Sequence, residues 1–243
     1  DNNDNNDNND IPELPAGRFG HASVGIGNFV FVIGGKAESY KNTVLRRVLR
    51  ININNIHNPT TKWESITPMR QRRYLFAAVA IGDVIYAAGG MDGNGKLSTI
   101  EMLDTATTTL EWVTLAARMS TARAWHGAVA IGNVMYIIGG VDDNRNELTS
   151  VEMFDTASQT FTEGPALPIA ITEMSAVAIG TLVIVVGGLT TGFQEIGHLY
   201  VLDTSASNPE WRKIGAELRT PRRNHTAVVV GDNLSICGGS DNG

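Results

Sequence analysis

Short apolar runs separated by turn residues dominate this chain, and the clearest pair of them lies near its middle. Residues 124–131 read AWHGAVAI and residues 134–138 read VMYII, with Gly132 and Asn133 between them. Continuous apolar runs of this kind are typical of strands that are buried on both faces. A glycine-asparagine pair suits a two-residue hairpin turn. We therefore predict two antiparallel strands, a at 124–131 and b at 134–138, joined by a tight turn.

Two further strands follow in the same segment. Residues 148–154 read LTSVEMF, in which apolar and polar positions alternate as they do in a strand with two different faces. Thr160 and Phe161 open a fourth, shorter run that ends before a turn containing proline. These runs predict strands c and d, so the unit in this segment is a four-stranded antiparallel sheet.

The four-stranded unit recurs along the whole chain. A Gly-Gly pair closes strand b five times, and successive pairs are 55, 50, 48 and 51 residues apart. The pairs are Gly34 and Gly35, Gly89 and Gly90, Gly139 and Gly140, Gly187 and Gly188, and Gly238 and Gly239. The repeats lie near residues 14–66, 67–116, 117–165, 166–215 and 216–243, and the last contains only strands a and b. A repeat of this length is typical of the blades of a β-propeller.

Other residue types keep fixed distances from the glycine pairs. Sixteen positions before each pair stand Arg18, Arg73, Arg123, Ile171 and Arg222, and three positions after these stand His21, Phe76, His126, Met174 and His225. An aromatic residue recurs near strand d, at Trp63, Trp112, Phe161 and Trp211. We expect each tryptophan to be an apolar wedge between neighbouring blades. We expect each Gly-Gly pair to let strand b end where those blades crowd the backbone.

The chain divides into two parts. Residues 1–13 form a tail whose first ten positions are all Asn or Asp, and such a low-complexity segment cannot supply a core. Residues 14–243 form one repeat domain. Four-stranded units of this kind pack face to face around a central channel. We therefore predict an all-β propeller of four-stranded antiparallel blades, with four complete repeats and half of a fifth, which makes an incomplete ring.

The repeat resembles that of the kelch family. An Arg, a strand, Gly-Gly, a strand ending in Asp and then a Trp make up that pattern, and RRYLFAAVAIGDVIYAAGG and RAWHGAVAIGNVMYIIGG are its most typical instances. The first repeat departs from the pattern by an insertion between strands b and c, at 36–47, and the fourth by Ile171 in place of Arg. The resemblance implies a propeller that usually has six or seven blades. It also implies that proteins are recognised on the face that carries the d–a and b–c loops.

Composition narrows the chemistry. The net charge of −6 argues against nucleic acid or an anionic membrane surface as partner, because both select Lys and Arg. No apolar run has the length of a membrane span. The single cysteine, Cys237, lies inside a predicted strand b, where we expect a buried side chain. His21, His126 and His225 come from blades that are not neighbours, so we expect neither a metal site nor a cofactor.

The repeated arginines lie beside the d–a loops, so we hypothesise that they form a basic mouth that binds an acidic segment. The candidate binding residues are Arg18, Arg73, Arg123 and Arg222, with Asp92, Asp142 and Arg145 in the b–c loops. The alternative is that each repeated arginine serves the fold by holding loop carbonyls or an acid. Alanine at Arg123 would weaken binding in the first case and stability in the second. The basic residues of the insertion, Lys41, Arg46, Arg47 and Arg50, offer a further contact surface.

Three functions are compatible with this pattern. The first is a protein-interaction module, the second a propeller enzyme of the sugar-acid epimerase or oxidase type, and the third a carbohydrate-binding propeller of the cell surface. The acids recur with the blades, as Glu101 and Glu152 do, which is typical of a structural role. We therefore predict a binding module with a protein partner and without catalytic activity.

Overall fold

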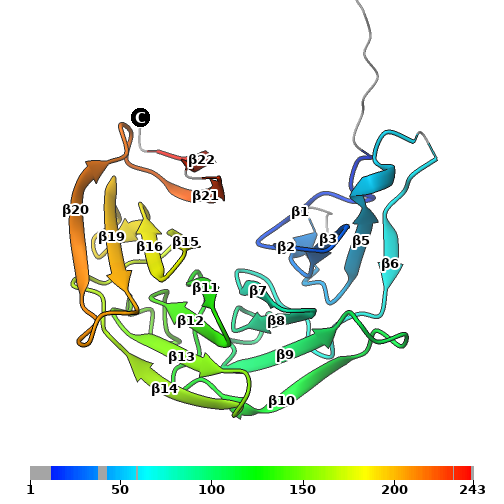
Figure 1. The fold of residues 1–243 in the computed structure, drawn as a ribbon, viewed down its shortest axis with the longest axis horizontal. Coiled ribbons are helices and arrows are strands. Elements are labelled where there is room, and N and C mark those ends of the chain that lie inside the picture. Colours follow the sequence, from blue (N-terminus) through cyan, green and yellow to red (C-terminus); the bar gives the residue numbers. More distant parts are fainter. Residues whose placement is uncertain (1–11, 38–42, 59, 232, 242–243) are drawn as a thin grey trace, which may run out of the picture.

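The computed structural model describes residues 12–37, 43–58, 60–231 and 233–241, which form five antiparallel blades (Figure 1). Blade one contains β2 (Ala22–Ile26), β3 (Phe29–Ile33), β5 (Val48–Asn52) and β6 (Glu64–Ile66). Blade two contains β7 (Ala77–Ile81), β8 (Val84–Ala88), β9 (Thr99–Asp104) and β10 (Trp112–Arg118). Blade three contains β11 (Gly127–Ile131), β12 (Val134–Ile138), β13 (Val151–Asp155) and β14 (Thr160–Gly164). Blade four contains β15 (Ser175–Ile179), β16 (Leu182–Val186), β19 (His198–Asp203) and β20 (Trp211–Glu217), and blade five contains β21 (Arg223–Val230) and β22 (Asn233–Ser240).

Short elements decorate the loops between these strands. The pairs are β1 (Arg18–Phe19) with β4 (Lys36–Ala37) and β17 (Leu189–Thr190) with β18 (Gln194–Glu195), and a 3-10 turn spans Ile53–Asn55. The strands a of successive blades pack side by side, β2 on β7, β7 on β11, β11 on β15 and β15 on β21. The blades follow an arc with blade one at one end and β21 and β22 at the other (Figure 1). The predicted all-β propeller of four-stranded antiparallel blades is confirmed.

Strand a begins three residues later than the apolar pattern predicts. In blade three, β11 starts at Gly127 instead of Ala124. The reason is Trp125, whose φ of 54° is left-handed and cannot continue an extended strand. Leu75 and Glu173 have the same conformation before β7 and β15. These residues therefore belong to the d–a loops and not to the sheets.

The hydrophobic cores lie between the blades. Trp112 is 0% exposed and packs in one core with Ile33 of blade one. Trp211 takes the corresponding place between blades three and four, in one core with Ile138, and its Nε1 donates a hydrogen bond of 2.8 Å to the carbonyl of Pro165. Because each core is shared by two blades, each blade is stabilised by its neighbours, as in other repeat proteins.

The Gly-Gly pair marks the point where neighbouring blades touch. Gly89 and Gly90 have φ values of 65° and 88°, at which a side chain is strained. A Cβ on Gly89 would lie 2.6 Å from Cε1 of His126 and 2.8 Å from the carbonyl oxygen of Arg123, both in the next blade. A Cβ on Gly90 would lie 2.6 Å from Cβ of Phe76 in its own blade. The first glycine thus accommodates the next blade and the second accommodates the d–a loop of its own blade.

Cys237 is exposed, and the expectation of a buried side chain is wrong. Its counterparts Ile138 and Val186, in the strands b of blades three and four, are 0% exposed because they pack in cores shared with the following blade. Cys237 lies on β22 at the end of the arc, and no following blade covers it within the described part of the chain.

Candidate functional site

The repeated arginine of blade two lies inside its own blade. Arg73 is 0% exposed, and its Nη1 donates a hydrogen bond of 2.8 Å to the carbonyl of Gly89. Its Nη2 lies 2.7 Å from Oε1 of Glu101, which is also fully buried. The Glu101 carboxylate accepts two further hydrogen bonds, from the backbone N–H groups of Arg70 and Gln71. The arginine and the glutamate thus tie strand b, strand c and the d–a loop together.

Blade three repeats this arrangement. Arg123 is 0% exposed and donates to the carbonyls of Gly139 at 2.9 Å and Ser150 at 3.0 Å, and its Nη2 lies 2.8 Å from Oε1 of Glu152. A buried guanidinium group that bonds within its blade does not reach a partner. The predicted binding role is therefore wrong for Arg73 and Arg123, and their contacts match the alternative, in which arginine holds loop carbonyls and an acid.

Among the described residues, the arginines of the two outer blades have no glutamate partner. Arg18 is 7% exposed and donates to the carbonyl of Gly34 at 3.2 Å, while Leu49 occupies the register position that glutamate holds in blades two and three. Burial lowers the pKa of Arg18. Arg222 is half-buried and donates to the carbonyl of Gly238 at 2.8 Å. Arg18 is thus also unavailable to a partner, whereas Arg222 is partly accessible.

Blade four replaces the whole ion pair with apolar groups. Ile171 stands in the arginine position and Tyr200 in the glutamate position, and both are buried. The loop changes with them, because Pro168 stands where blade three has Ser120, whose N–H donates to Glu152. Proline has no N–H, so this blade needs no carboxylate to accept that hydrogen bond.

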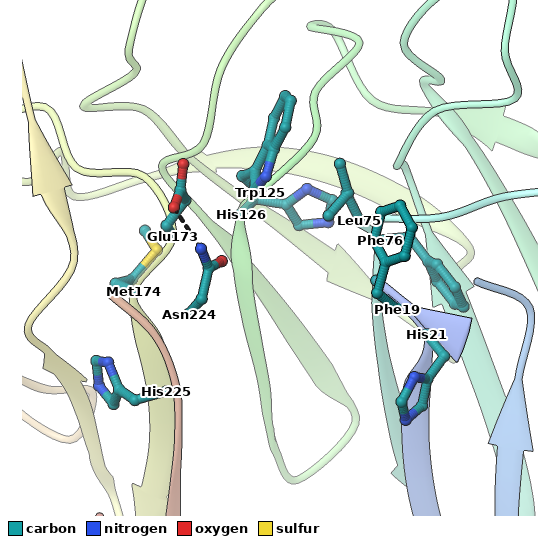
Figure 2. Close-up of a pocket in the computed structure, with 11 residues that line it drawn as sticks. Phe19, His21, Leu75, Phe76, Trp125, His126, Glu173, Met174, Asn224 and His225 are labelled. Atoms are coloured by element: carbon teal, nitrogen blue, oxygen red, sulfur yellow. Dashed lines mark hydrogen bonds between the residues drawn. The ribbon is translucent and has the colours of Figure 1, made fainter. Parts of the chain in front are cut away.

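A cavity of about 650 Å³ opens at the centre of the face that carries the d–a loops (Figure 2). We call it the mouth, and we call that face the loop face. The residues that line the mouth are Phe19, Gly20, His21, Leu75, Phe76, Trp125, His126, Glu173, Met174, Asn224 and His225. They come from the d–a loops and the starts of strand a in all five blades, so the mouth is the place where the blades converge.

Backbone hydrogen bonds join the d–a loops of successive blades around the mouth. The N–H of Leu75 donates to Gly20 at 2.7 Å, that of Trp125 to Leu75, that of Glu173 to Trp125 and that of Asn224 to Glu173, each of the last three at 3.0 Å. All five residues have left-handed φ values, between 52° and 60°. We call these five positions the belt.

Three of the five side chains of the belt are not those that its backbone favours. A left-handed backbone suits Gly and Asn and costs other residues on the order of 1 kcal/mol. Leu75, Trp125 and Glu173 nevertheless hold it, and all three line the mouth. Strained residues that the surroundings enforce cluster at functional sites, which makes the mouth the candidate site.

One side of the mouth is polar. Oε2 of Glu173 accepts hydrogen bonds from Nδ2 of Asn224 at 2.6 Å and from Nη1 of Arg223 at 3.2 Å (Figure 2 shows the first). Nε of Arg223 also lies 3.0 Å from Oε1 of Glu195. These contacts fix the Glu173 carboxylate at the boundary between blades four and five.

The opposite side of the mouth is aromatic. The rings of Phe19 and Tyr74 meet edge to face, with centroids 6.3 Å apart. Nζ of Lys36 lies 5.9 Å from the centroid of Phe19 and 5.4 Å from that of Tyr74, which is the geometry of a cation–π contact. Phe19 is 42% exposed, so this aromatic edge is open to a ligand.

The three repeated histidines are neutral at ordinary pH. Burial lowers the pKa of His126 to about 3, and the charge of Arg123 lowers it further. Burial also lowers the pKa of His21 and of His225, each helped by the repeated arginine of its own blade. No group of three or more His, Cys, Asp or Glu side chains with metal-binding geometry occurs among the residues that the structure describes.

The b–c loop candidates lie on the loop face but outside the mouth. Oδ1 of Asp92 accepts the N–H groups of Asn94 and Gly95, and Oδ1 of Asp142 accepts two N–H groups of its own loop in the same way. Backbone hydrogen bonds and nearby positive charge outweigh desolvation and lower the pKa of Asp92. Arg145 is exposed. The two aspartates shape their loops, and Arg145 remains a candidate contact.

The basic insertion of blade one divides between loop and strand. Arg46 and Arg47 are exposed. Arg50 lies on β5, where its Nε pairs with Glu64 at 2.9 Å and its guanidinium group stacks on Phe29, so it is not part of the insertion's surface. The prediction for Lys41 falls outside the described residues.

The sequence pattern alone did not indicate Trp125, Glu173 and Asn224 as site residues. They stand two positions after the repeated arginine position, where the residue type differs in all five blades. That change was the available signal, because a position that the fold does not determine is free to serve recognition.

Blades of this construction, each with a glycine pair after strand b and all but blade four with the repeated arginine, define a β-propeller of the kelch type. The sequence model of the KLHDC2/KLHL20/DRC7 Kelch-repeats domain matches residues 8–188. The chain therefore belongs to the kelch-repeat family. The solved chain titled "Structure of YjhT" superimposes with a TM-score of 0.82 at 15% identity, over 94% of this chain and 74% of that one, which shows a shared fold.

Curated relatives match shorter stretches. Kelch-like protein 40 of Xenopus laevis is 35% identical over 95 residues, which are 39% of this chain and 14% of that protein. Kelch-like protein 36 of Rattus norvegicus is 31% identical over 114 residues, 46% of this chain and 18% of that protein. The tRNA wybutosine-synthesizing protein 2/3/4 of Arabidopsis thaliana is 32% identical over 101 residues, 40% of this chain and 9% of that protein. The matched segments thus span less than a fifth of these relatives.

The family supports a protein-interaction propeller in general terms. The Kelch-like relatives favour an interaction module over an enzyme without deciding between them. The described residues contain no helix with the length and apolar character that a membrane crossing requires.

Proposed function

We propose that this propeller is a protein-interaction module that holds a segment of a partner protein in the mouth and acts by binding, not by catalysis. The observation that supports this proposal is the belt. Its five positions are equivalent in the fold, yet they carry five different residues, and all of them line the mouth. The backbone conformation and the hydrogen bonds of these positions repeat from blade to blade, so the belt combines a fixed backbone with individual side chains, as a recognition site requires.

The dimensions and the chemistry of the mouth support a peptide ligand. A cavity of about 650 Å³ lies within the range of ordinary ligand pockets. It offers exposed aromatic surface at Phe19, aliphatic surface at Leu75 and fixed polar groups at Glu173 and Asn224. Aromatic anchors surrounded by a few oriented polar groups are typical of protein-binding hot spots.

The described residues that line the mouth include no Lys or Arg, whereas an acidic partner needs a basic lining. Three of the four repeated arginines are buried, and two of them are neutralised by glutamates of their own blades. We therefore base the proposal on the belt and the aromatic edge, and treat Arg145 and Arg222 as rim contacts. Exposed charges at a rim contribute about 0–1 kcal/mol each.

A random peptide library displayed on phage tests the proposal. We expect the protein to enrich a family of related peptides, and we expect Trp125→Ala to abolish their binding. The matched control is Ile53→Ala, because Ile53 is an exposed apolar residue, 41% accessible, in the c–d loop of blade one on the opposite face. The proposal is wrong if no peptide family is enriched, or if the enriched peptides respond to Ile53→Ala and not to Trp125→Ala.

A further inference from the structure

Trp125 and Glu173 are neighbours on the belt. The N–H of Glu173 donates to the carbonyl of Trp125 at 3.0 Å, and the hydroxyl of Thr172 donates to the same carbonyl at 3.3 Å. In Figure 2 the indole of Trp125 and the carboxylate of Glu173 extend to the same side of the mouth. The mouth therefore presents an aromatic face and a carboxylate next to each other.

One oxygen of the Glu173 carboxylate is available to accept a hydrogen bond from a ligand. Both hydrogen bonds that it accepts, from Arg223 and Asn224, fall on Oε2, and Oε1 has no hydrogen-bond partner within the described ranges. The side chain of Glu173 is 13% exposed, so it is held firmly but reaches solvent. Arg223 pairs with Glu195 as well, so two carboxylates share one guanidinium group.

The positive charges of the repeated arginines lie at other blades. Besides burial, the charge of Arg18 lowers the pKa of His21 in blade one, and the charge of Arg222 lowers the pKa of His225 in blade five. Blade four, which carries Glu173, has Ile171 in the arginine position. Glu173 is also the one acid among the residues that line the mouth.

The aromatic edge already holds a cation of the chain itself. Lys36 lies over the rings of Phe19 and Tyr74 at 5.9 Å and 5.4 Å. Trp has the most favourable ring for such a contact, and an adjacent carboxylate adds a charge-assisted hydrogen bond. Trp125 is half-buried and, unlike Phe19 and Tyr74, has no cation over its ring among the described residues.

From this geometry we infer that the mouth selects a cationic side chain of the partner segment, an arginine or a lysine, and holds it between the indole of Trp125 and Oε1 of Glu173. The inference rests on the proposed function and specifies the chemistry of the partner. Arginine fits better than lysine, because its planar guanidinium group can stack on the indole while it bonds the carboxylate. The partner is therefore a basic segment, not the acidic one that the repeated arginines suggested.

The same phage library tests the inference separately from the proposed function. We expect the enriched peptides to share an Arg or Lys next to an apolar residue. Enrichment of peptides rich in Asp or Glu, or of purely apolar peptides, would overturn the inference and leave the proposed function standing. Absence of any enrichment would overturn both.

Two charge-removing variants then locate the contact. We expect Glu173→Gln to weaken binding of a selected Arg peptide about tenfold or more, since a charged pair at a partly buried interface is lost. Glu163→Gln on β14, an exposed acid outside the mouth, is the matched control and should leave the affinity unchanged. Trp125→Phe should keep part of the affinity that Trp125→Ala loses. Equal effects of Glu173→Gln and Glu163→Gln, with unchanged melting temperatures, would contradict the inference.

Discussion

The buried ion pair of blade three can be replaced by the uncharged residues that occupy the same positions in blade four. Replacing Arg123 by Ile removes the guanidinium group that bonds the carbonyls of Gly139 and Ser150 and pairs with Glu152 at 2.8 Å. The Glu152 side chain, 7% exposed, would then be a buried carboxylate without a counter-ion. Breaking such a pair from one side costs about 3–5 kcal/mol. For a domain of this size the melting temperature should fall by about 6–20 °C.

The combined variant should recover most of this loss. Blade four carries Ile171, Tyr200 and Pro168 in place of the arginine, the glutamate and the serine that donates to it. The triple variant with Arg123→Ile, Glu152→Tyr and Ser120→Pro therefore leaves neither an unpaired charge nor the N–H that Glu152 accepts from Ser120. Replacing a buried pair by packed apolar groups is often neutral or stabilising. We expect the triple variant to lie within about 1–2 kcal/mol of the parent, far from the sum of the single losses.

Urea unfolding followed by tryptophan fluorescence measures these differences in the free energy of unfolding, and the m-value should be the same in all variants. A single Arg123→Ile variant as stable as the parent would refute the structural role of the buried pair. If the triple variant loses as much unfolding free energy as its three single variants together, the equivalence of blades three and four is refuted.

Three further predictions follow from single positions. Gly89→Val should destabilise the fold strongly, because the valine side chain would collide with His126 and Arg123. Gly25→Ala should be tolerated, because nothing lies within 4 Å of the added Cβ. Thermal melting of the two variants measures the difference. Replacing His126 by Met, the residue of blade four, should flatten the pH dependence of stability. The pKa of His126 is about 3 in the folded protein and 6.5 in the unfolded chain, so below pH 6.5 the unfolded chain takes up a proton that the folded protein does not. The stability of the parent is therefore full above pH 6.5 and falls by up to about 1.4 kcal/mol per pH unit as the pH is lowered toward 3. Urea titrations at pH 7, 5.5 and 4 should then show parent and variant diverging, and parallel curves would contradict the assignment. Arg222→Met should cost less than about 1 kcal/mol, because Arg222 is half-buried and has no acid partner in its blade; a loss as large as that of Arg123→Ile would be inconsistent with the described contacts.

The period of the repeat and the run of apolar residues were sufficient to predict the architecture. The prediction for strand b at 134–138 coincides with β12, because a doubly buried strand has a continuous apolar sequence. The predicted start of strand a at Ala124 is three residues too early, because tryptophan is not a residue type that indicates a left-handed backbone such as that of Trp125. Local propensity does not contain that information, since the conformation is set by hydrogen bonds to the neighbouring blades.

The burial of Arg73 and Arg123 could have been predicted from the sequence. Glu101 and Glu152 occur in two blades that carry the arginine, and in blade four both members of the pair are absent together. Residues that appear and disappear together within one chain are candidates for direct contact. Blade one breaks this rule, because it keeps Arg18 but has Leu49 at the glutamate position, so the burial of Arg18 without an acid could not be predicted from the pattern. The mouth itself was not predictable in detail, because its lining comes from five separate loops.

The belt separates what the fold needs from what a ligand needs. Successive belt positions are joined by main-chain hydrogen bonds, whose N–H donor every residue except proline possesses. A substitution at Leu75 or Trp125 therefore alters the surface of the mouth without removing the main-chain hydrogen bonds between blades. A lineage that carries this scaffold can change the surface of the mouth one blade at a time, by single substitutions that each begin from a folded protein.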